Sequence, residues 1–196
     1  METEHRPSAR PARRMVIATG CVLLAATAAW SDLLLVVLGQ VVPGWAVGGA
    51  LLAAAPVIMR AGAAPCRPVA DGVVKERRAM PRWVPGLAAV VAGLGSVLGA
   101  VGDLGADYRV LEPRGPGGCR AVVREASFLL AGSGEVYVVG PIGVGRQVGS
   151  WRADDGYRPV ASGTYELHWG ATDGVLTVNG GKGDPVWPGL HELDCG

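Results

Sequence analysis

The sequence has 196 residues, 49% of them hydrophobic, and its 18 basic and 17 acidic residues give a formal net charge of +1. Mean hydropathy is +0.30, and the apolar residues are concentrated before position 105. Residues 105–196 contain eight basic and eleven acidic residues. This mildly acidic balance argues against nucleic acid, so we expect no nucleic acid as a partner.

Two long apolar stretches fill the first half of the chain. Residues 15–59 carry one charged residue, Asp32, and are long enough for two helices, because one membrane span takes roughly 20 residues. Residues 83–104 form a second stretch without charge until Asp103. We therefore expect a transmembrane region over residues 15–104 in the lipid bilayer. Its three helices are predicted near 15–38, 43–60 and 83–103.

The turn between the first two helices has two candidate positions. Pro43 and Gly44 are favoured because both residue types break helices, and the following Trp45 is typical of the membrane interface. The alternative, at residues 30–32, places Asp32 among lipid head groups but leaves a first span of about 16 residues, which is short for a hydrocarbon core of roughly 30 Å. With the favoured turn, Asp32 is a candidate intramembrane polar site. One carboxylate without a partner is thin support for ion or proton transport.

The arginines predict the orientation. They are concentrated in the N-terminal segment 1–14 and in the 61–82 loop, and basic residues beside spans favour the cytoplasmic side. Both segments are therefore predicted to be cytoplasmic, in the plasma membrane, with the chain after residue 104 outside. Cleavage near residues 26–28 would follow a signal-peptide pattern, but the C-terminal half would reach the same side. We expect the first segment to remain as an anchor.

The sequence of the exported half predicts a small β domain. Residues 105–118 are rich in Gly and Pro and predict a linker. For residues 119–196 we expect an all-β antiparallel domain of five to seven strands, a sandwich or a barrel. Tyr165, Leu167 and Trp169 alternate onto one face, and a turn at 172–174 follows, so residues 164–179 predict a β-hairpin. Other strand-like runs are 121–124, 127–130 and 135–139.

Cys119 and Cys195 bracket this domain. In an exported compartment disulfides persist, so we predict that these two cysteines are bonded. The closed loop of about 75 residues would contribute on the order of 4 kcal/mol in the chain-entropy model. Cys21, within a predicted span, and Cys66, in the predicted cytoplasmic loop, are expected to stay reduced.

No motif in the chain carries recognisable chemistry. His168 alternates onto the same strand face as Glu166, which is typical of a solvated surface, and the only other exported histidine is His191. Residues 140–145 are Gly-rich, but no helix follows them as a nucleotide-binding loop requires. No Gly-x-Ser-x-Gly elbow is present. We therefore predict no catalytic residue, no cofactor, no metal and no enzymatic activity.

Two groups of residues are candidates for contacts with partners. The large aromatics should mostly form the core, because Phe128 is the only Phe, but a subset exposed together would make a face for protein or carbohydrate. Gly95 and Gly99 have the spacing that lets membrane helices approach closely, which predicts a homo-oligomer contact. The candidate binding aromatics are Trp151, Tyr157, Trp169 and Trp187.

The C-terminal runs 119–125, 153–159, 163–167 and 189–192 carry a resemblance over roughly the last 80 residues. The chain resembles uncharacterised small three-span membrane proteins of high-GC Gram-positive bacteria with an exported C-terminal β domain. The resemblance implies this layout and no activity. Our leading hypothesis is a membrane-anchored exported β module that binds an envelope protein or a carbohydrate wall polymer. The alternatives are a subunit or regulator of a larger membrane complex acting through its helices, and an exported enzyme without a recognisable motif.

Overall fold

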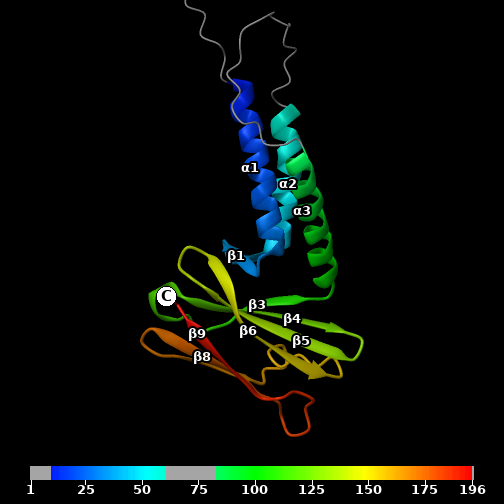
Figure 1. Ribbon diagram of the computed structural model, residues 1–196. Coiled ribbons are helices and arrows are strands. Elements are labelled where there is room, and N and C mark those ends of the chain that lie inside the picture. The colour runs from blue at the N-terminus through cyan, green and yellow to red at the C-terminus, as the bar shows by residue number, and fades with distance from the viewer. Residues whose placement is uncertain (1–9, 61–82, 196) are drawn as a thin grey trace, which may run out of the picture. The chain divides into compact units, whose positions relative to one another are not determined.

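The computed structural model describes residues 10–60 and 83–195, which divide into two units (Figure 1). The helical unit comprises the chain up to Trp30 and the segment Trp45–Leu98. The β unit comprises Ser31–Gly44 and the chain from Gly99 onward. The β unit is thus built from two separate parts of the sequence, the first of which lies between two helices. Of the predicted cytoplasmic segments, residues 1–9 and 61–82 lie outside the described part.

Three helices form in the first half of the chain, as predicted. They are α1 (Arg10–Trp30), α2 (Gly44–Arg60) and α3 (Trp83–Gly102). The 20 residues of α3 are long and apolar enough to cross a membrane, since a rise of 1.5 Å per residue gives about 30 Å. The apolar stretches of the other two, Val16–Trp30 and Gly44–Ile58, are shorter.

Small residues bring these helices together. A Cβ atom placed on Gly48 of α2 would lie 2.9 Å from the carbonyl oxygen of Ala25 in α1. One placed on Gly95 of α3 would lie 2.6 Å from Nε1 of Trp30, the last residue of α1. Trp30 Nε1 also donates a hydrogen bond to the carbonyl of Val91 at 3.0 Å. Glycine therefore provides the close approach that membrane helices commonly use.

The predicted first helix, 15–38, is wrong at its end. Helix α1 stops at Trp30, and the chain forms a hairpin of β1 (Leu33–Val37) and β2 (Gln40–Pro43) before α2 begins at Gly44. Both candidate turn positions therefore mark real helix ends, and the apolar run between them is sheet. Leu38 and Gly39 form its two-residue turn, with φ of +53° and +82°, as the right-handed twist of a tight hairpin requires. The backbone groups of β1 are satisfied on its other side by β6 (Val144–Asp154), with Leu34 opposite Gly145.

The β unit contains two antiparallel sheets, and the predicted all-β domain is confirmed. The larger sheet also includes β3 (Asp107–Val110), β4 (Arg120–Phe128) and β5 (Ala131–Val139), in the order β2-β1-β6-β5-β4-β3. The smaller sheet has the order β7-β8-β9. Its strands are β7 (Tyr165–Trp169), β8 (Asp173–Val178) and β9 (Gly189–Asp194).

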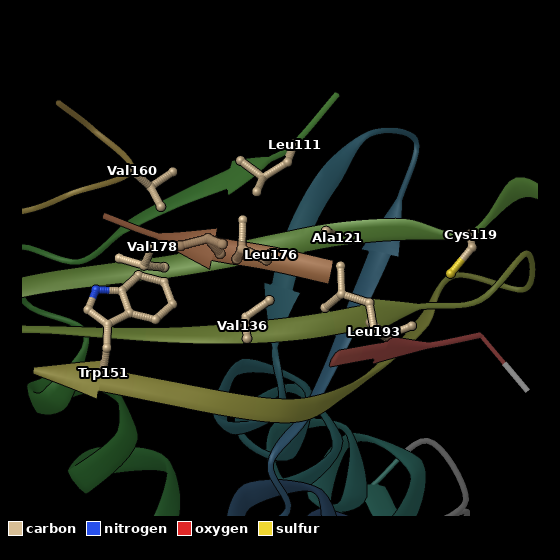
Figure 2. Packing of buried hydrophobic residues seen from close by; sticks show 11 residues of the cluster. Leu111, Cys119, Ala121, Val136, Trp151, Val160, Leu176, Val178 and Leu193 are labelled. Carbon is tan, nitrogen blue, oxygen red and sulfur yellow. The ribbon is translucent and has the colours of Figure 1, made fainter. Parts of the chain in front are cut away.

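The main core lies between the two sheets (Figure 2). Alternation along each strand directs apolar side chains inward, with Leu176 and Leu193 of the smaller sheet facing Val136 and Trp151 of the larger one. The opposite face of the larger sheet carries a second cluster. Its buried members are Leu34, Val36, Val122, Tyr137 and Val139. The inserted hairpin therefore contributes two residues to the core of the β unit.

The strand predictions hold best where alternation is clear. The hairpin predicted over 164–179 is present as β7 and β8. The runs 121–124 and 127–130 belong mostly to one strand, β4, which ends at Phe128. The predicted linker 105–118 is not only a linker, because Asp107–Val110 pairs with β4 and residues Pro116–Gly118 form a short 3-10 helix. Strands β6 and β9 were not anticipated from the sequence.

Candidate functional site

The predicted disulfide is present between Cys119 and Cys195. Cys119 immediately precedes β4 of the larger sheet, and Cys195 immediately follows β9 of the smaller one. The bond therefore ties the two sheets together at the edge of the main core, where Cys119 is almost fully buried. Cys21 in α1 is a free thiol, and Cys66 lies outside the described residues.

A buried polar network begins where α3 ends. Arg124 of β4 donates from Nε to Asp103 Oδ1 at 2.6 Å and from Nη2 to the carbonyl of Gly102 at 2.6 Å. The hydroxyl of Tyr108 donates to Asp103 Oδ2 at 2.9 Å. The side chains of Arg124 and Asp103 are only 13% and 11% exposed. This arrangement satisfies a terminal carbonyl of α3 and fixes the start of the β unit to its larger sheet.

The network continues across β5 to Glu135. Its carboxylate lies 3.6 Å from Arg124 Nη1 and accepts a hydrogen bond from the Tyr137 hydroxyl at 2.7 Å. Burial raises the pKa of Tyr108 and of Tyr137, and their carboxylate partners raise it further, so both phenols remain donors. Burial lowers the pKa of Arg124, but the bond to Asp103 and the charge of Glu135 outweigh it and the net pKa is raised. The charged and phenolic groups of this network satisfy one another's hydrogen bonds. This arrangement fits a role in positioning the strands better than a role in proton transfer.

Glu125 is the one buried charged residue among the described residues, 1% exposed. Its two carboxylate oxygens accept backbone N–H bonds from Val160 at 2.9 Å and Ala161 at 2.7 Å. Burial raises the pKa of Glu125, while these two bonds and the charges of Arg109 and Arg158 act against the rise. The side chain thus holds the segment between β6 and β7. No sequence pattern distinguishes it from an exposed strand acid.

The four candidate binding aromatics do not form one exposed face. Trp151 is buried in the main core. Trp169 donates from Nε1 to the carbonyl of Pro113 at 2.8 Å. The Tyr157 hydroxyl bonds to Thr164 and Asp184, each at 2.8 Å. Only Trp187, 85% exposed, is free of such packing within this set. Three of the four stabilise the domain itself because it has few other large side chains.

The two histidines of the β unit have different surroundings. His168 lies 3.7 Å from Glu166 with both side chains largely exposed, as the alternation predicted. His191 packs against Trp151, with ring centroids 5.6 Å apart, and its buried Nε2 has no hydrogen-bond partner among the described residues. Burial lowers the pKa of His191. Within the described ranges, 10–60 and 83–195, no cluster of three potential metal ligands occurs.

The remaining predicted site residues take other positions. Asp32 is exposed in the connection between α1 and β1, so it is not inside a helix. Gly95 is buried against Trp30 of the same chain. Gly99, half-buried, accepts the backbone N–H of Asp103. The homo-oligomer contact through Gly95 and Gly99 stays a prediction.

No family model, curated protein or solved structure matches the chain.

Exposed apolar side chains at three turns were missed from the sequence. Phe128, Leu129 and Leu130, at the turn joining β4 to β5, are 78%, 84% and 73% exposed. The run 127–130 was predicted as strand because its residues are apolar, yet Leu129 has φ of +54° and lies in the turn. Leu38 and Ile142 occupy two other turns and are 99% and 85% exposed. Contiguous exposed apolar residues commonly mark contact surfaces.

Proposed function

We propose that the protein is a membrane-anchored extracytoplasmic β module, held by three membrane-spanning helices, that binds a protein partner of the cell envelope. The pairing of β1 with β6 carries the proposal. It incorporates the connection between α1 and α2 into the same sheet as the strands that follow α3.

This pairing supports a three-span topology. A bilayer cannot pass through a hydrogen-bonded sheet, because separated strands would leave backbone groups unpaired in hydrocarbon. The ends of the helices at Trp30, Gly44 and Gly102, all directly joined to β-unit segments, then belong on one side of the membrane. The N-terminus and the 61–82 loop belong on the other. Their arginines favour the cytoplasm for that side, so the β unit is assigned to the exterior.

The surface of the helices supports membrane insertion. Large apolar side chains point outward along all three helices, with Leu24, Val57 and Leu94 more than half exposed. In water these side chains would be an aggregation hazard, whereas lipid is a suitable solvent for them. The apolar stretches Val16–Trp30 of α1 and Gly44–Ile58 of α2 each correspond to about 22 Å. A slightly thin or locally adapted bilayer accommodates such lengths.

The apolar turn Phe128–Leu130 favours a protein partner over a carbohydrate polymer. Carbohydrate recognition would need exposed aromatic faces, and three of the four candidate aromatics are engaged inside the domain. Three consecutive exposed apolar side chains fit an apolar pocket of another protein.

Epitope tags test the topology. One tag is inserted after Gly39, in the β1–β2 turn, one after Gly196, and one within the 61–82 loop. In cells with an intact membrane, external antibody should reach the first two and not the third. Opposite sidedness of the first two tags would exclude the shared sheet and the topology. Access to the loop tag alone would reverse the orientation.

A photo-cross-linking amino acid tests the partner. At position 129 of the full chain, irradiation of cells should give a discrete protein adduct that the Phe128→Ser variant reduces. The matched control is the same amino acid at Arg152, an exposed position on β6 outside the apolar turn. Equal adducts at both positions, or none at 129, would reject the partner surface.

A further inference from the structure

Two turns of the β unit are fastened to each other. The backbone N–H of Val36 in β1 donates to the carbonyl of Gly143, in the turn between β5 and β6, at 2.7 Å. That turn is closed by Gly143 N–H donating to the Gly140 carbonyl at 2.9 Å. Gly143 has φ of +81°, and a Cβ atom there would lie 2.6 Å from the Val36 carbonyl oxygen. Gly143 is therefore needed for this close backbone contact.

A pocket of about 440 Å³ lies between these turns. Its lining includes Val36 and Val139, which are 9% and 1% exposed. Two arginines line it, Arg114 and Arg120, and no acidic residue does. The other lining residues are Leu38, Gly39, Gly140, Pro141, Ile142 and Gly143.

The two guanidinium groups are available to a ligand. Arg120 is half-buried on β4, with no ion pair to any residue in the described part of the chain. Arg114 lies 3.6 Å from Glu112, but the two side chains are 59% and 66% exposed, so this contact is weak and easily exchanged. Two permanently charged guanidinium groups beside a pocket that no carboxylate lines favour an oxyanion as ligand. Phosphate matches their planar, bidentate geometry.

The rim of the pocket points to the source of the phosphate. Leu38 and Ile142 both line the pocket, yet they are 99% and 85% exposed. A freely soluble phosphate would make no use of them. A lipid headgroup presents its phosphate next to glycerol and acyl carbon, so one ligand satisfies both the arginines and the apolar rim.

We propose that this pocket binds a phosphate group, and that its source is an anionic lipid headgroup. The site goes beyond the envelope-partner function proposed above. It is tested by direct binding, so its failure would leave the topology and cross-linking results unaffected.

The test is a calorimetric titration of the full chain in a non-ionic detergent with dihexanoyl phosphatidic acid, inorganic phosphate and glycerol phosphate in separate arms. Arg114→Gln/Arg120→Gln should weaken binding of every phosphate ligand roughly a hundredfold, about tenfold for each charged contact. Leu38→Ser/Ile142→Ser should weaken only the lipid. The matched control is Arg152→Gln, an exposed arginine outside this pocket.

The outcomes are distinct. Binding of all three ligands with equal affinity, lost in the arginine variant, would retain the phosphate site and overturn the lipid source. No heat of binding with any ligand, or equal weakening by Arg152→Gln, would overturn the site. An unchanged melting temperature in each variant shows that the comparison is made between folded proteins.

Discussion

The helical unit and the β unit pack by opposite means. In the helical unit the most buried side chains are small, with Ala25 and Ala92 fully buried, while leucines such as Leu24 and Leu94 face outward. In the β unit the fully buried side chains include large ones, such as Leu176 and Leu193. The first pattern suits a solvent as apolar as leucine, and the second suits water.

The difference predicts where each unit is sensitive. The helical unit depends on close backbone approach, so adding atoms at its contacts should harm it and removing apolar atoms from its surface should not. The β unit depends on burial and on saturated polar groups, so removing a partner should harm it. The measurements below use the full chain in detergent.

Loss of the disulfide should have the largest effect. In Cys119→Ser/Cys195→Ser a crosslink between residues 76 apart is removed, which should lower the free energy of unfolding of the β unit by about 4 kcal/mol. Hydrogen exchange resolves the two units, and the amides of α2 and α3 should keep their protection. Cys21→Ser, in α1, is the control with no expected effect on the β unit. Equal loss of protection in the helices would show that the units do not unfold separately.

Breaking the polar network should come next. Arg124→Met removes the charged donor to Asp103 and to the Gly102 carbonyl in a largely buried site, where Asp103 keeps the neutral Tyr108 hydroxyl, at a cost of about 3 kcal/mol. Asp103→Leu/Arg124→Met removes both charges and should be more stable than the single variant. Thermal unfolding measured by circular dichroism compares them, with Arg152→Met as the exposed control. A double variant no more stable than Arg124→Met would mean that the buried charge is not the cause.

Much of this arrangement follows from local sequence patterns. Apolar length predicted three helices, alternation at 164–169 predicted the β7–β8 hairpin, and the position of two cysteines predicted their bond. Each pattern reports a local preference that the tertiary structure keeps. The hairpin β1–β2 was not predicted, since an apolar run that follows a helix is expected to continue it. The run forms a strand instead because β1 pairs with β6, more than a hundred residues later in the chain.

The buried polar residues were harder to predict from the sequence, again because their partners are distant along the chain. Glu125 has a structural role because the fold places the backbone N–H groups of Val160 and Ala161 beside its carboxylate. Asp103 has one because the fold places the guanidinium of Arg124 beside it. Those partners are distant along the chain. The aromatics were expected to lie mostly in the core with a subset exposed, but which Trp is buried depends on which sheet covers it.

Enlarging a helix contact should have a smaller effect and should fall on the other unit. In Gly48→Val the new side chain meets the Ala25 carbonyl and the Ala29 side chain, each 2.9 Å from the Cβ position, so α1 and α2 must separate at a cost of about 2 kcal/mol. Gly86→Val, where nothing lies within 4 Å of the Cβ position, is the matched control. Exchange protection should fall in α1 and α2 only. Equal sensitivity at both glycines would point to helix propensity as the cause.

Protonation of His191 should have the smallest effect. Burial lowers its pKa below the ordinary value of 6.5, so as pH falls through this value the unfolded chain gains a proton that the folded chain does not. Stability is therefore lost on acidification, by at most about 1.4 kcal/mol per pH unit, because the folded and unfolded states differ by at most one bound proton at this imidazole. Glu125, whose raised pKa makes its ionisation costly in the folded state, has the opposite effect at lower pH, because protonating it stabilises the folded state.

The difference between the protein and His191→Gln, measured by denaturant unfolding at several pH values, isolates the histidine. His168→Gln, at an exposed position of β7, should keep the full pH dependence. If the two variants gave the same pH profile, the buried Nε2 beside Trp151 would not be the titrating group, and the core between the sheets would be insensitive to this charge.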